Sequence, residues 1–80
     1  MQTTAKINIV TDEVLNFLAA GVTPEQILAF RPSEIVDARA HYLLERNRNQ
    51  RLTLEEREEL DEFAHINQFM TMLKIRARKQ

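Results

Sequence analysis

The sequence predicts an all-α fold, in which two short helices precede an antiparallel helical hairpin with a long second helix. Three observations predict this fold. Apolar residues recur at helical spacing, helix-start signals precede the apolar runs, and the 80 residues include only one glycine and two prolines. A chain of this length is enough for one small helical domain, which we expect to span residues 1–80.

The first ten residues have the composition of a strand. Residues 1–10 are rich in threonine, isoleucine and valine, which favour extended backbone. Because the sequence offers no second strand, we expect this segment to be extended or frayed, or to pair with a second copy of the chain. Thr11 is then expected to cap a helix over about residues 12–20, and Gly21 is expected to end it in a left-handed conformation.

Two further helix starts follow in quick succession. Residues 23–26, TPEQ, combine a threonine cap, a proline at the first helical position and a glutamine that can complete a capping box. The short helix should reach Phe30, because Pro32 keeps the residue before it out of the α region. Ser33 can cap a third helix over about residues 34–48, in which Ile35, Ala38, Tyr42 and Leu43 recur at helical spacing. We expect Tyr42 in the core, with its hydroxyl at the rim.

The fourth helix is expected to be the longest. Asn49 is the predicted left-handed residue after the third helix. Residues 53–56, TLEE, form a complete capping box, and the helix should run from there almost to the C-terminus. One face of it carries an apolar stripe with spacings of 3 and 4 residues, formed by Phe63, Ile66, Met70, Leu73 and Ala77.

Helix lengths lead to the functional prediction. The fourth helix should be about 36 Å long and the third about 22 Å, so the third cannot cover all of the fourth. Either the two N-terminal helices fold back over the uncovered part or a second chain does. We favour a homodimer or another helical partner, and a non-catalytic protein–protein interaction function. The predicted partner interface consists of Phe63, Ile66, Phe69, Met70 and Leu73.

Composition and motifs argue against several other classes. The formal net charge is −1, and no apolar run approaches the length that spans a bilayer. We therefore expect a cytoplasmic protein without membrane association. There is no cysteine, one serine and no glycine-rich loop, so we expect no enzyme, no cofactor and no catalytic residue.

The carboxylate-rich start of the fourth helix has two interpretations, of which a metal site is the first. Glu62 and His65 have the spacing found in di-iron helix bundles. The alternative is a solvated acidic face that matches the positive end of the helix, with Asp37, His41 and Glu45 as a similar surface group on the third helix. We favour the solvated face and expect no metal ligand.

Nucleic-acid binding is the alternative function. Basic residues occur at the predicted turn and in the C-terminal tail, and they could contact phosphates. An acidic first turn on the fourth helix opposes its use as a recognition helix. The candidate residues are Arg46, Arg48, Arg51, Lys74, Arg76, Arg78 and Lys79.

The stretches ILAFRPS, LLERNRNQRLTLEEREELDEF and FMTMLKIRARK resemble a family of small, mostly uncharacterised bacterial helical proteins. The resemblance covers roughly residues 24–79. Leu54 stands where the family commonly has proline, and Asn49–Gln50 where it often has a nearby glycine. The resemblance implies an antitoxin-like or regulatory partner of a protein encoded by a neighbouring gene, such as a nuclease. It defines no functional residue.

Overall fold

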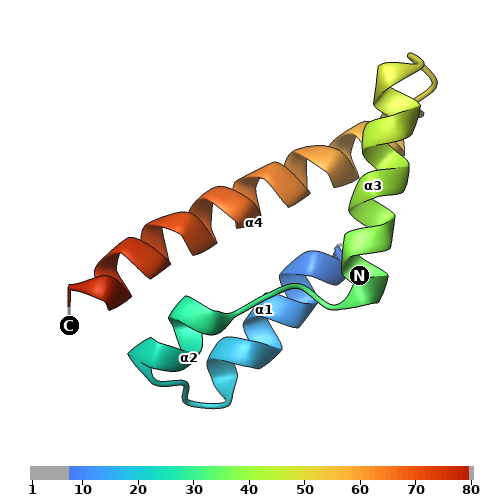
Figure 1. Ribbon diagram of the computed structural model, residues 1–80. Coiled ribbons are helices and arrows are strands. Elements are labelled where there is room, and N and C mark those ends of the chain that lie inside the picture. The colour runs from blue at the N-terminus through green and yellow to red at the C-terminus, as the bar shows by residue number, and fades with distance from the viewer. Residues whose placement is uncertain (1–7, 80) are drawn as a thin grey trace, which may run out of the picture.

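The computed structural model describes residues 8–79, which form four α-helices and no strand (Figure 1). This confirms the all-α prediction for the described residues. The helices follow each other with short connections, and their bounds are α1 Ile9–Ala19, α2 Pro24–Ala29, α3 Glu34–Arg48 and α4 Leu54–Arg78.

Helix α1 begins three residues earlier than the sequence predicted. Asn8 has extended backbone, and its side-chain oxygen accepts a hydrogen bond from the Val10 N–H at 2.9 Å. Val10 is only 7% exposed, so burial of its side chain outweighs its preference for a strand. The predicted cap at Thr11 and the extended state of Ile9 and Val10 are therefore wrong. The rest of that prediction, on residues 1–7, lies outside the described residues.

The other helix-start signals are confirmed. The Thr23 hydroxyl accepts from the Gln26 N–H at 3.2 Å, and the Gln26 side chain accepts from the Thr23 N–H at 2.8 Å. Thr53 and Glu56 exchange the equivalent pair of bonds, each 3.1 Å long. The Ser33 hydroxyl caps α3 as predicted. These local bonds satisfy backbone donors that the first turn of a helix leaves without partners, which is why sequence alone located them.

The turns between helices agree with the prediction at one position and differ at another. Gly21 has φ of +77°, as expected for the glycine that follows α1. The left-handed residue after α3 is Gln50, with φ of +57°, and the predicted Asn49 has φ of −91°. The third helix nevertheless ends at Arg48, as predicted, and only the left-handed residue comes one position later than expected.

Helix α4 is the centre of the fold, because α1, α2 and α3 each pack against it. Helices α3 and α4 meet at the turn and diverge away from it, with α1 in the opening between them (Figure 1). The Asn8 side chain donates to the Glu59 carbonyl oxygen at 3.0 Å, and the Lys74 Nζ donates to the Phe30 carbonyl oxygen at 3.1 Å. These bonds place α1 beside the first half of α4 and α2 beside its second half. An antiparallel packing of α3 on α4 is not confirmed.

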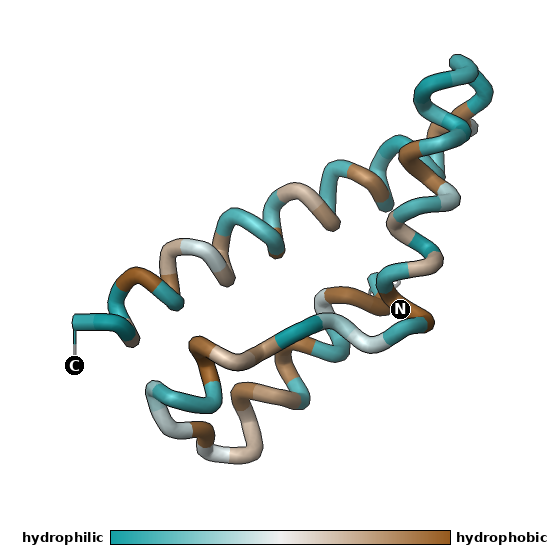
Figure 2. Tube along the Cα trace, viewed as in Figure 1, coloured by the Kyte–Doolittle hydropathy of each residue, from teal (hydrophilic) through white to brown (hydrophobic). Residues whose placement is uncertain are grey.

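The core is small for the length of the chain. Only six of residues 8–79 are buried. On α3 the predicted apolar face is confirmed at Leu43, which is fully buried, and is wrong at Ile35 and Tyr42, which are 77% and 45% exposed. Apolar residues are distributed along α1 and α2, whereas the turn between α3 and α4 is hydrophilic (Figure 2). The buried residues are Val10, Val14, Val36, Leu43, Met70 and Ala77.

Candidate interaction surfaces

A set of ion pairs joins α3 to α4 near the turn. Arg39 binds Glu59 through two bonds of 2.8 Å, from Nε to Oε2 and from Nη2 to Oε1. Arg46 Nε donates to Glu56 Oε1 at 2.9 Å, and its Nη2 donates to the Arg51 carbonyl oxygen at 2.7 Å. We call Arg39, Tyr42, Arg46, Glu56 and Glu59 the arginine clasp.

Tyr42 lies between the two arginines of the clasp. The guanidinium carbons of Arg39 and Arg46 lie 5.0 Å and 5.5 Å from the centre of its ring, within the range of cation–π contacts. Tyr42 was expected in the core with its hydroxyl at the rim. It is instead a half-exposed ring that holds two arginines in the orientation that their glutamates need.

The clasp shifts the pKa of two of its members. The hydrogen bonds from Arg39 to Glu59 raise the pKa of the arginine, which desolvation only partly opposes. The Thr53 N–H and then Arg46 hold the pKa of Glu56 below its ordinary value. Both shifts favour the charged forms, so the clasp is an ion-pair network at neutral pH.

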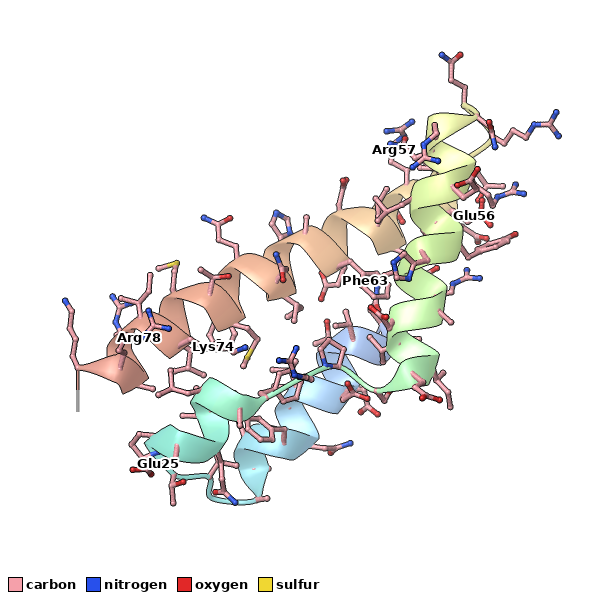
Figure 3. The ribbon with its side chains drawn as sticks, viewed as in Figure 1. Glu25, Glu56, Arg57, Phe63, Lys74 and Arg78 are labelled. Atoms are coloured by element: carbon pink, nitrogen blue, oxygen red, sulfur yellow. The ribbon has the colours of Figure 1, made fainter. Side chains whose placement is uncertain are left out.

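The spacing of the charged residues is a sequence signal for the clasp. Arg39 and Arg46 are seven residues apart on one helix, and Glu56 and Glu59 are three apart on the next. Each spacing places both side chains on one helix face. The acidic block is therefore not wholly a solvated face, because Glu56 and Glu59 turn towards α3 (Figure 3 labels Glu56).

An apolar groove of about 510 Å³ lies between α1, α3 and α4. Its walls are the apolar side chains of these helices and of the segment before α3. Phe63 and Lys74 lie on the side of α4 that faces α1 and α2 (Figure 3). Asp37 and Asp61 are the acidic residues of the lining. The apolar lining consists of Val10, Val14, Phe30, Pro32, Val36, Ala40, Leu44, Leu60, Phe63, Ala64, Ile66 and Met70.

The structure divides the five predicted interface residues among different environments. Phe63, Ile66 and Met70 line the groove, and Met70 is only 6% exposed because the N-terminal helices fold back over α4. Leu73 is half-buried. Phe69 is 46% exposed and lies outside the groove lining.

A second apolar surface, which we call the outer face of α4, was only partly anticipated. Phe69, Met72 and Ile75 are 46%, 46% and 47% exposed. They recur every three residues, as neighbours on one side of a helix do. In the view of Figure 1, the upper side of α4, away from α1 and α2, has no helix of residues 8–79 over it.

The basic candidates for nucleic-acid contact are not brought together. The turn and the tail lie at opposite ends of the 25-residue helix α4 (Figure 1). Arg46 is held by Glu56, Arg48 pairs with Glu45 at 3.0 Å, and Lys74 donates to a carbonyl oxygen of the chain. Nucleic-acid binding by these residues stays a prediction.

The carboxylates and histidines form no larger cluster in the described part of the chain. Among residues 8–79, no three His, Cys, Asp or Glu side chains converge on a point that could hold a metal ion. Glu62 instead accepts a 2.6 Å bond from the Thr11 hydroxyl, and His41 lies 3.8 Å from Asp37 on the surface. Within the same residues, no helix is long and apolar enough to span a membrane.

Comparison with known proteins leaves the chain without an assigned relative. No protein-family model matches it, and no curated protein and no solved structure matches it either. The resemblance to small bacterial helical proteins therefore stays an expectation, and the surfaces themselves carry the functional argument.

Proposed function

We propose that this chain is a non-catalytic helical module that binds other polypeptides, in an antitoxin-like or regulatory role. The observation that carries the proposal is the apolar groove, which three of the five predicted interface residues line. An apolar groove between helices suits the apolar face of an amphipathic helix, with anchors at i, i+3 or i+4, and i+7.

The groove also indicates the chemistry of its occupant. Leu44 is 49% exposed on the α3 wall and faces apolar residues of α4 across the groove. Asp37 and Asp61 are part of the same lining, and Lys74 is engaged by the Phe30 carbonyl oxygen. The partner helix should therefore carry basic residues beside its apolar anchors, because opposite charges at a rim favour association.

The proposal is tested with a defined partner, the product of the adjacent gene. The two proteins are co-expressed, and the mass of the complex and its dissociation constant are measured by light scattering and calorimetry. We expect a complex of fixed stoichiometry. Leu44→Glu should weaken it at least tenfold, because a carboxylate would enter an apolar groove.

Leu15→Glu is the matched control, since Leu15 is 54% exposed, close to the 49% of Leu44, and lies outside both the groove lining and the outer face of α4. The control variant should bind the partner normally. No complex at about 100 µM, or a complex that Leu44→Glu leaves unchanged, would remove the proposal. Salt-sensitive DNA binding that Arg76→Gln and Arg78→Gln abolish would favour the nucleic-acid alternative instead.

A further inference from the structure

Charge is distributed unevenly along α4. Residues 55–62 contain six carboxylates and one arginine, whereas residues 74–79 contain four basic residues and no acid. Between them on the outer face lie Phe69, Met72 and Ile75, each nearly half exposed. A helix with an acidic half and a basic half matches a reversed copy of itself.

We propose that the outer face of α4 binds the same face of a second copy of this chain, with the two α4 helices antiparallel. A two-fold axis makes the same patch meet itself, so the acidic half of each helix lies over the basic half of the other. This deepens the proposed function, because it names a partner and a surface separate from the groove.

One register satisfies both ends of the pair. A two-fold axis between Gln68 and Phe69 brings Glu58 opposite the partner's Lys79, and by symmetry this pair forms at both ends. The same axis brings Phe69 close to the partner's Phe69, where an aromatic anchor contributes most.

The charged side chains that this register uses are available. Glu58 and Lys79 are exposed and make no ion pair within residues 8–79. The two ends are about 32 Å apart along the helix, so they cannot reach each other in one copy. An attraction between Glu58 and Lys79 can only be intermolecular.

A charge swap on the full chain tests the inference by sedimentation. The unmodified chain should dimerise at micromolar concentration, and more weakly as salt increases. Glu58→Lys alone and Lys79→Glu alone should each raise the dimer dissociation constant at least fivefold, because each places like charges together twice in the dimer. The double variant should restore it to within threefold of the unmodified chain. Circular dichroism verifies that every variant is folded.

Asp37→Lys, in the groove lining, is the matched control and should leave the dimer unchanged. A chain that stays monomeric at about 100 µM in low salt would overturn the inference. A dimer that the single swaps do not weaken, or that the double swap does not restore, would overturn it as well. None of these results bears on the groove experiment with Leu44→Glu, so the two proposals fail separately.

Discussion

The two sides of α4 differ in how the chain uses its apolar residues. The inner side carries Met70 and Ala77, which are 6% and 7% exposed beneath the other helices. The outer face carries Phe69 and Met72, which are both 46% exposed on the same helix, one and two residues from Met70. A single long helix thus supplies the core on one side and an uncovered apolar surface on the other. Burial by the chain itself, rather than hydrophobicity alone, separates residues that fold the protein from residues that can bind.

The largest expected effect comes from exchanging methionine for aspartate on the two sides. Met70→Asp should lower the free energy of unfolding by about 3 kcal/mol or more, because a carboxylate would be buried without a partner. Met72→Asp should lower it by less than about 1 kcal/mol, since its side chain is near water. Urea unfolding followed by circular dichroism measures both at concentrations where the chain is monomeric. Equal losses for the two variants would show that the outer face is buried in the monomer.

A smaller effect is expected at Gln50, in the turn between α3 and α4. Gln50 has φ of +57°, which strains an L residue but not glycine. Gln50→Gly should therefore raise the free energy of unfolding by about 0.5–1 kcal/mol. Asn49→Gly is the matched control, because φ at Asn49 is −91° and glycine there only adds freedom to the unfolded chain. Thermal unfolding should move upward for the first variant and not for the second.

The smallest expected effect concerns the arginine clasp, which joins α3 to α4 and belongs to neither the inner side nor the outer face of α4. The pKa of Glu56 is lower in the folded protein than its ordinary value of 4.5, so ionised Glu56 stabilises the fold at pH values above 4.5. That contribution is lost as pH falls through the lower folded pKa. Glu56→Gln should thus melt below the unmodified chain at neutral pH, and the difference should shrink as the pH falls below the ordinary pKa of 4.5.

Glu55→Gln is the control for this comparison. Glu55 occupies the same first turn, is exposed, and has no arginine partner in the described residues. A difference in melting temperature that persists for Glu56→Gln in acid would mean that the capping bonds, and not the charge, carry the stabilisation.

Sequence reasoning succeeded where structure is local. The two capping boxes and Gly21 were located because a helix start or end depends on a few neighbouring residues. It failed at Val10 and Tyr42, whose environments depend on helices distant in the chain. Val10 is helical despite its preference for strands, because its side chain is buried. Tyr42 is 45% exposed and contacts two arginines instead of lying in the core.

The same contrast between local signals and the packing of distant helices applies to the candidate surfaces. Helix length and apolar spacing indicated that α4 would present more apolar surface than α3 could cover, and the interface residues were chosen on that ground. Spacing did not reveal that Met70 would be buried and Phe69 left exposed, because that depends on where α1 and α2 pack against α4. The interface prediction therefore combined residues of the groove with one residue of the outer face.

The position of Tyr42 gives this protein an internal spectroscopic reporter. The chain has one tyrosine and no tryptophan, so its aromatic fluorescence comes chiefly from a single ring. That ring touches two arginines whose carboxylate partners belong to α4. Any event that separates α3 from α4, including insertion of a helix into the groove, changes the surroundings of the fluorophore. Opening of the fold can be followed in real time without attaching a label.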